Sequence, residues 1–339
     1  MNTNTMNAAV LCAVGDLRYT KVPLPERKPG EVLLKVMACG VCGSDIPRVF
    51  EKGTYHFPTI PGHEFAGQIV ETDEADKALL GRRAAVFPLI PCRRCAACEV
   101  GEYANCLDYD YYGSRRDGGF AEYIAVDRRN LVLVPDSLSY ECASLLEPGA
   151  VALGAVRRLG VKLGDLAVVY GAGPIGLIAA QWMREAGAGK VRIVDINQKK
   201  IDFAAKFGFE PYDPGRDGPA DCVIEGTGAS AALNNAVLSL KPHGRLVLLG
   251  NPAGDMTIKQ STYSQILRRE IIMTGTWNSS HNRTVDDWQM TADAMSSGKI
   301  RYEELITHRY PLSRCPDALE MMRSGTEFYN KVTIVNHSV

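Results

Sequence analysis

The stretch that decides the fold is Val168-Val169-Tyr170-Gly171-Ala172-Gly173-Pro174-Ile175-Gly176, an apolar run that leads into the pattern GxGxxG. The first glycine permits a tight turn, the second lets the backbone approach a pyrophosphate, and the third allows a helix to pack closely on the strand. The start of that helix offers N–H donors to phosphate. The pattern therefore predicts a dinucleotide site at Gly171, Gly173, Pro174, Ile175 and Gly176, although a glycine turn without a cofactor is the alternative.

A second apolar run supports the dinucleotide site, because it ends in Asp195, 19 residues after Gly176. At this spacing a carboxylate accepts hydrogen bonds from the ribose hydroxyls of the cofactor. The same carboxylate would repel a 2′-phosphate, and the residues after it are Ile196 and Asn197 rather than an arginine. The sequence therefore favours NAD over NADP.

The pattern of apolar and polar residues changes at about residue 165. Beyond that point helical patterns separate apolar runs at 166–170, 191–194, 221–224, 246–249 and 271–274. Such alternation predicts a doubly wound parallel sheet, here a nucleotide-binding domain over 150–289. Before it, residues 7–135 hold short β-like runs separated by Gly and Pro, which is typical of an irregular antiparallel barrel. The run 331–335 is expected to return to this first domain, which is therefore assigned to 1–149 and 290–339.

Four of the ten cysteines lie close together in the pattern C-x2-C-x2-C-x7-C, as Cys92, Cys95, Cys98 and Cys106. Four thiolates can surround one Zn²⁺ tetrahedrally and close it to substrate, which makes the metal structural. A nucleic-acid-binding zinc knuckle and a redox cluster are the alternatives. The knuckle lacks a basic surplus, since the formal net charge is −1.

Other metal-binding residue types are dispersed along the chain. Cys42 is followed two positions later by Ser44, His63 is followed by Glu64, and Glu147 stands in Leu-Glu-Pro. Taken singly, a cysteine is usually a buried apolar residue, and a histidine is usually a core or surface group. These residues indicate a metal site only when they are considered together.

Six segments occur in the order found in zinc-containing medium-chain dehydrogenases, and the chain resembles that family from Met6 onward. The segments are GVCGSD (40–45), PGHEFAG (61–67), the four-cysteine lobe, DGGFAEY (117–123), LEP (146–148) and GAGPIG (171–176). The resemblance implies a GroES-like irregular β-barrel catalytic domain joined to a Rossmann domain. Within the family, the segments CGSDIPRVF and GSRRDGGFAEY most resemble members that oxidise polyols or polyol phosphates.

The resemblance also implies roles for individual residues. Cys42, His63 and Glu147 would bind the catalytic zinc, with Glu64 as a fourth or exchanging ligand, and Ser44 would be the proton-relay hydroxyl. The lobe would hold a second, structural zinc. Further cofactor contacts would be made by Leu249, Gly250, Thr276 and Trp277.

Two departures from the family pattern are visible. Many members carry a histidine three residues after the relay hydroxyl, and this chain has Pro47 there. The outer proton path must therefore differ. The segment from Glu71 to Gly81 also looks shorter than usual.

The substrate is less well defined by the sequence. Arg48, Arg115 and Arg116 fall in segments that border the substrate cleft in relatives, and a guanidinium suits phosphate. Their alternative role is pairing with Asp110 or Asp117. Asn278 stands where free-polyol relatives often have an arginine. We therefore expect zinc- and NAD-dependent oxidation of a secondary hydroxyl of a polyol phosphate, of the galactitol-1-phosphate type, to the ketose phosphate.

Two other functions remain open at this stage. One is dehydrogenation of a free polyol (sorbitol-like) or of L-threonine, and the other is a non-catalytic protein that retains the fold. The composition, 46% hydrophobic and 23% charged, is that of an ordinary globular protein and gives no reason to expect nucleic acid or a membrane as partner. A polar N-terminus from Met1 to Thr5 lacks a signal-peptide pattern, so a cytoplasmic location is expected. The family resemblance implies a homodimer or homotetramer.

Overall fold

A computed structural model describes residues 4–336, which form two compact units. The first unit combines Met1–Glu147 with Ser280–Val339, and the second is Pro148–Ser279. The chain thus changes unit at 147/148 and 279/280, where the sequence suggested 149/150 and 289/290. The first three residues of the polar N-terminus lie outside the described part of the chain.

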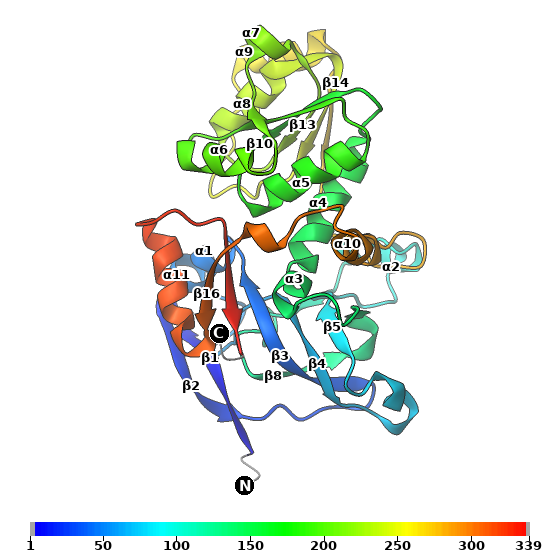
Figure 1. Cartoon of the computed structure of the whole chain (residues 1–339), viewed down its shortest axis with the longest axis vertical. Coiled ribbons are helices and arrows are strands. Elements are labelled where there is room, and N and C mark those ends of the chain that lie inside the picture. Colours follow the sequence, from blue (N-terminus) through cyan, green and yellow to red (C-terminus); the bar gives the residue numbers. More distant parts are fainter. Residues whose placement is uncertain (1–3, 337–339) are drawn as a thin grey trace. The chain divides into compact units, whose positions relative to one another are not determined.

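A seven-stranded sheet dominates the first unit (Figure 1). Its strands follow the order β16 (Ile306–Pro311), β17 (Lys331–Val335), β3 (Glu31–Val41), β4 (Glu64–Glu71), β5 (Arg83–Val86) and β9 (Leu131–Leu133), with β8 (Tyr123–Asp127) also paired to β3. Because β17 pairs antiparallel with β3, the end of the chain does return to the first unit. Leu34, Phe65 and Ile69 are among its largest fully buried side chains, and each contributes roughly 1.5–3 kcal/mol of burial free energy.

Smaller elements complete this unit. The hairpin of β1 (Thr5–Ala13) with β2 (Asp16–Pro23) and the short pair β6 (Leu89–Ile90) with β7 (Asp110–Tyr111) form separate two-stranded sheets. Its helices are α1 (Asp45–Pro47), α2 (Ala96–Glu99), α3 (Tyr140–Ser144), α10 (Asp287–Ser296) and α11 (Cys315–Ser324). Short helical segments lie at Arg48–Lys52, Glu74–Leu79, Tyr103–Asn105, Arg128–Asn130, Glu303–Leu305 and Leu312–Arg314.

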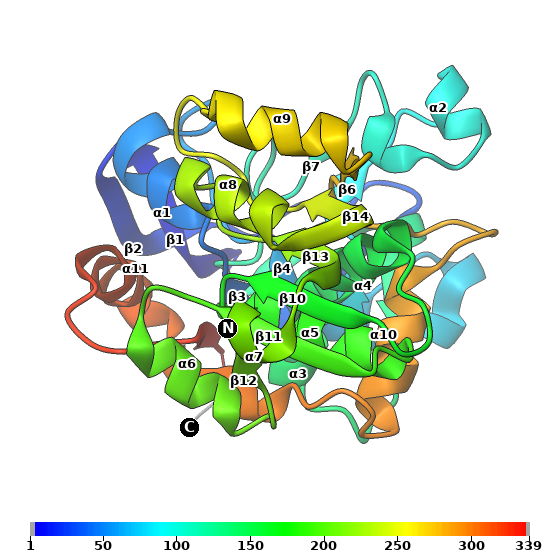
Figure 2. The same ribbon diagram turned by 90° about the horizontal axis from the view of Figure 1, so that it is seen from above.

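The second unit is the doubly wound parallel sheet that the sequence predicts. Six strands follow the order β12 (Glu210–Pro211), β11 (Lys190–Val194), β10 (Leu166–Tyr170), β13 (Ala220–Glu225), β14 (Leu240–Leu248) and β15 (Ile272–Gly275). Figure 2 shows α5 (Pro174–Glu185) on one face of this sheet, and α8 (Ser230–Ser239) with α9 (Gln260–Arg268) on the other. The remaining helices are α4 (Leu146–Leu159), α6 (Gln198–Ala205) and α7 (Pro214–Asp217).

The strand order reverses between β10 and β13, because the chain moves outward from β10 to β12 and then returns to the other side. Ligands of such sheets bind outside the carboxyl ends of the strands at this switch point. The apolar stretch 166–183 supplies β10, the glycine turn and most of α5. Among the helices described, none is long and apolar enough to cross a membrane.

The glycines of the turn after β10 have different structural constraints. Gly171 has φ +106°, in the region that favours glycine. A Cβ on Gly176 would lie 1.9 Å from the carbonyl oxygen of Gly171, whereas a Cβ on Gly173 would meet nothing within 4 Å. The third glycine is therefore required for packing of α5 on β10, and the second leaves open space above the turn.

We predict that Gly176→Ala lowers the free energy of unfolding by about 1–3 kcal/mol, since the backbone must shift to admit the methyl group. Gly173→Ala is the matched control and should change it by less than about 0.5 kcal/mol. Chemical unfolding followed by circular dichroism measures both. Equal stability of the two variants would contradict the packing argument.

Candidate active site and metal centres

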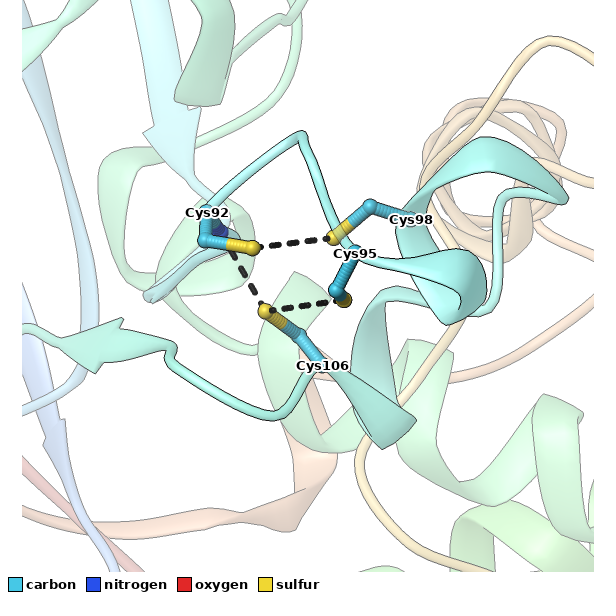
Figure 3. A group of neighbouring side chains, drawn as sticks. All are labelled: Cys92, Cys95, Cys98 and Cys106. Atoms are coloured by element: carbon cyan, nitrogen blue, oxygen red, sulfur yellow. Dashed lines mark hydrogen bonds between the residues drawn. The ribbon is translucent and has the colours of Figure 1, made fainter.

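The four-cysteine lobe closes around a point between its sulfur atoms (Figure 3). The Sγ atoms of Cys92 and Cys98 lie 3.9 Å apart, as do those of Cys95 and Cys106. A disulfide requires about 2.0 Å, whereas a tetrahedron of Zn–S bonds of about 2.3 Å requires sulfurs about 3.8 Å apart. The four thiols therefore fit a tetrahedral zinc ion and do not form disulfides.

Backbone amides favour the thiolate at two of the four cysteines, whereas burial raises the pKa of Cys98 to about 12. Hydrogen bonding from the Leu107 backbone lowers the pKa of Cys95 to about 6, and hydrogen bonding from the Arg94 backbone lowers the pKa of Cys92. The backbone N–H of Cys92 also donates to Cys106 Sγ over 3.2 Å. Metal ligands must be deprotonated, so these donors prepare the lobe for a cation.

A second group of metal-binding side chains lies at one end of the large sheet, where Cys42, His63 and Glu64 place their ligand atoms within 4.8 Å of one another. Cys42 follows β3, and Glu64 begins β4. Because the two strands are antiparallel, with Gly40 opposite Glu64, the end of one meets the start of the other. The mixture of thiolate, imidazole and carboxylate is that of catalytic zinc sites with an open position.

Lys331 forms a buried ion pair with Glu64 in this group. It begins β17, which also runs antiparallel to β3, and its Nζ donates to the carbonyl oxygen of Val41 over 3.0 Å. The side chains of Lys331 and Glu64 are only 3% and 1% exposed. A Cβ on Gly40 would lie 2.2 Å from Glu64 Oε2, so this glycine makes room for the pair.

Asp45 and Arg48 lie behind His63. The Asp45 carboxylate is fully buried, accepts from the backbone N–H of Cys42 over 3.0 Å and lies 3.6 Å from His63 Nδ1. Arg48 donates to the same carboxylate over 2.6 Å. Arg48, a predicted phosphate contact, is thus engaged in orienting Asp45. His63 Nδ1 is buried and, among residues 4–336, lies just beyond hydrogen-bond distance of any partner, with the Asp45 carboxylate facing it.

Glu147 and Ser44 flank the group without belonging to it. Glu147 lies in the first turn of α4, and the pKa of its carboxyl is raised to about 7, chiefly by burial and also by Glu64, while His63 and Lys331 oppose the shift. Its carboxylate stands outside the set within 4.8 Å. Ser44 precedes α1 as its N-cap, two residues beyond Cys42, and is half-buried.

The segment that carries Arg115 and Arg116 packs directly on the residue before His63. A Cβ on Gly113 or Gly118 would lie 2.6 or 2.1 Å from the Gly62 carbonyl oxygen, so two glycines permit this close approach. The backbone N–H of Gly119 donates to the same oxygen over 2.8 Å. The loop is therefore held against the group of Cys42, His63 and Glu64, called the catalytic group below.

The two arginines of this loop have different partners. Arg116 forms an ion pair with Asp110 at 2.5 Å, which is the alternative role considered from the sequence. The guanidinium of Arg115 lies between the rings of Tyr55 and Tyr109, 4.4 and 4.6 Å from their centroids. In the described part of the chain, Arg115 forms no ion pair with a carboxylate.

Arg115 lines a surface cavity of about 540 Å³ together with Tyr55, Tyr109 and Arg94. Ring contacts lead from this cavity to the catalytic group: Tyr109 lies 6.4 Å from Tyr111, whose ring lies 5.8 Å from that of His63. His56 Nε2 lies 3.1 Å from the Arg115 carbonyl oxygen, which holds the loop at 53–59 against this segment.

The predicted cofactor residues all follow carboxyl ends of parallel strands in the second unit. Asp195 follows β11, Leu249 and Gly250 follow β14, and Thr276 and Trp277 follow β15. One Asp195 oxygen accepts from the Ala172 backbone N–H over 2.8 Å, which joins the acid to the glycine turn. Asn278 has a left-handed backbone, with φ +53°.

Three residues of the first unit were missed by the sequence reasoning. Lys331 and Asp45 occupy ordinary positions in the chain, a strand start and the residue after Ser44, so their role depends on strand pairing. Tyr111 belongs to an aromatic run after Cys106, and burial raises the pKa of its phenol well above the usual value. That aromatic run was the available signal.

Comparison with known proteins agrees with this architecture. The profile "Alcohol dehydrogenase GroES-like domain" matches residues 28–136, and "Zinc-binding dehydrogenase" matches residues 174–297. Galactitol 1-phosphate 5-dehydrogenase of Escherichia coli (strain K12) is 33% identical over 90% of this chain and 92% of its own. Sorbitol dehydrogenase of Bombyx mori is 32% identical over 94% of this chain and 95% of its own.

The crystal structure of galactitol-1-phosphate dehydrogenase from Escherichia coli superposes with a TM-score of 0.91 and 32% identity over 97% of this chain and 100% of that one. Two further structures of this fold contain NADP and NADH. Zinc and NAD(P) are the cofactors typical of these enzymes. The chain belongs to the zinc-binding alcohol and polyol dehydrogenase family, oxidoreductases that act on CH–OH groups.

Proposed function

We propose that this enzyme oxidises a secondary hydroxyl of a polyol phosphate, of the galactitol-1-phosphate type, to the ketose phosphate with NAD. The observation that carries the proposal is Arg115. Its guanidinium has no carboxylate partner among the described residues, lines a cavity and belongs to the loop packed on Gly62. A guanidinium held between two aromatic rings is oriented before an anion arrives, which lowers the entropy cost of binding.

The catalytic group would work as follows. Cys42, His63, Glu64 and Glu147 would hold the catalytic zinc, and the four-cysteine lobe would hold a structural one. A bound zinc would supply the Lewis acidity that makes the alcohol more acidic, and NAD would be the hydride acceptor. Asp45 orients the His63 ring, and Lys331 competes for the Glu64 carboxylate, which suits an exchanging ligand. Ser44 would pass the proton outward, with solvent beyond it because position 47 is proline.

Preference for NAD rests on Asp195 in this proposal. The acid follows β11 at the edge of the sheet where the glycine turn lies, and its carboxylate is fixed by two backbone donors, Ala172 and Asn197, each at 2.8 Å. Its free lone pairs remain available to ribose hydroxyls, and its charge disfavours a 2′-phosphate.

A free polyol is the second candidate substrate. The similarity to sorbitol dehydrogenase of Bombyx mori, 32% identity, is nearly equal to that with galactitol 1-phosphate 5-dehydrogenase, 33% identity. A free polyol would leave Arg115 without an ionic partner. The two substrates therefore differ in what they require of this one side chain.

The two zinc sites should differ in lability, because four thiolates close one while mixed ligands leave the other open. We predict that brief chelation removes about half of the zinc and nearly all activity while the fold persists. Cys42→Ala should behave in the same way, whereas Cys98→Ala should lose stability first. Metal analysis with circular dichroism measures these effects, and fully active protein with a single zinc would refute two sites.

Arg115→Ala should lower kcat/KM for a polyol phosphate about tenfold or more, since charge-assisted hydrogen bonds contribute roughly 1.5–3 kcal/mol. Activity with the matching free polyol should hardly change. Arg116→Ala is the matched control, because it removes the same charge from the same loop but from a side chain already paired with Asp110. Steady-state kinetics with both substrates measures the difference.

The proposal would be wrong if the unmodified enzyme used free hexitols as well as their phosphates. It would also be wrong if Arg115→Ala and Arg116→Ala reduced activity with both substrates in parallel, because general damage to the loop would then explain the loss.

We also infer a homodimer or homotetramer in the cytoplasm. In the described sheet β15 has a neighbouring strand on one side only, and Ile272 on it is 60% exposed. Leu267 and Tyr263 of the nearby α9 are exposed as well. An unpaired apolar strand edge favours pairing with a second copy. The five cysteines not assigned to zinc are also free, which supports a reducing compartment.

We predict that Ile272→Lys shifts the oligomer towards monomer, because a charge would be buried at the paired edge. Leu163→Lys is the control, since Leu163 is 92% exposed in the loop before β10. Sedimentation velocity measures the distribution. A monomeric unmodified protein would rule out the assembly.

A further inference from the structure

Glu225 is a buried acidic residue of the nucleotide-binding unit, and no sequence motif pointed to it. It is the last residue of β13, beside Tyr170 of β10 on one side and Leu248 of β14 on the other. It therefore stands at the carboxyl edge of the sheet, at the switch point between β10 and β13. Its side chain is only 1% exposed.

The Glu225 carboxylate holds the turn that follows it. Oε1 accepts from the backbone N–H groups of Thr227 and Gly228 over 2.7 and 3.1 Å, and the Thr227 hydroxyl donates to it as well. Every partner is a donor, so the ionised carboxylate satisfies all of them. Among residues 4–336 no lysine, arginine or histidine forms an ion pair with it, and its negative charge is not neutralised by a salt bridge.

This turn interlocks with the turns after the neighbouring strands. A Cβ on Gly171 would lie 3.2 Å from Thr227 Cγ2, and a Cβ on Gly250 would lie 2.1 Å from the Gly228 backbone nitrogen. The Glu225 carbonyl oxygen also accepts from Leu249 and Gly250, over 2.8 and 2.9 Å. Glu225 thus ties the turns after β13 and β14 together directly, and Thr227, which it holds, meets the turn after β10.

The Glu225 carboxylate lies in the half of the sheet that would bind the nicotinamide end of the cofactor. A doubly wound sheet binds one mononucleotide over each of its halves, with the glycine turn and the acidic residue on the ribose in the first half. In this chain the first half of the sheet holds β10, β11 and Asp195. The second half begins with β13, so the nicotinamide mononucleotide would bind over the second half. The oxidised nicotinamide ring is a cation, and the reduced ring is neutral.

We propose that Glu225 is a positioning residue of the cofactor crevice, which fixes the turn at 226–228 and supplies a buried negative charge that favours oxidised over reduced cofactor. An unpaired buried charge is costly to the fold by itself. A cationic ligand nearby offsets part of that cost, and a neutral one does not. The inference rests on the use of NAD but not on the identity of the alcohol.

The experiment measures dissociation constants for NAD⁺ and NADH with no alcohol present, by calorimetry and by NADH fluorescence, on zinc-loaded protein. Glu225→Gln removes the charge and keeps the size. We expect its Kd for NAD⁺ to rise about fivefold more than its Kd for NADH, as a charge interaction across a partly solvated site implies. Glu225→Asp keeps the charge but shortens its reach, so both constants should rise together and their ratio should stay near that of the unmodified enzyme.

Asp165→Asn is the matched control. Asp165 is buried in the same unit but precedes β10, at the opposite edge of the sheet, where it pairs with Arg245. This variant should lose stability while its NAD⁺/NADH ratio is unchanged. A ratio in Glu225→Gln equal to that of the unmodified enzyme would overturn the proposal, as would an equal shift in Asp165→Asn. A failed assignment of the polyol phosphate would leave these binding measurements unaffected.

Discussion

The catalytic end of the barrel depends on the antiparallel pairing of β3 with β4 and with β17. That pairing brings Cys42, Glu64 and Lys331 together, although the last of them lies near the opposite end of the chain. The buried ion pair of Glu64 with Lys331 is possible only because Gly40 lacks a side chain at the point of contact. Removing either charged partner would leave the other buried and uncompensated, which is strongly destabilising.

Neighbouring residues hold this group in position through successive contacts. Asp45 faces His63, and Arg48 in turn donates to Asp45, so this arginine supports the group whether or not it also contacts substrate. On the substrate side, the close approach of Gly113 and Gly118 to Gly62 couples the loop that carries Arg115 to the same group. Positioning by such indirect contacts commonly governs the precision of a metal site.

The nucleotide-binding unit is organised by a different constraint, the meeting of strand ends at the switch point. Glycine is required where turns approach one another, as Gly176 does to Gly171 and Gly250 to Gly228. Two acids lie at this edge, Asp195 after β11 and Glu225 at the end of β13. The first has solvent and ribose hydroxyls as prospective partners, and the second is enclosed by backbone donors.

The sequence by itself determined the doubly wound sheet, the returning terminal strand and the four-cysteine lobe, because each depends on local spacing: GxGxxG after an apolar run, alternating periodicity, and C-x2-C-x2-C-x7-C. Cys42 and His63 became recognisable through motifs whose order matches a family. Only the tertiary structure decided the partners of Arg48, Arg115 and Arg116 and the surroundings of Lys331 and Glu225. Those contacts arise from strand pairing and loop packing between distant segments, and a charged side chain carries no local signal of the partner it will meet.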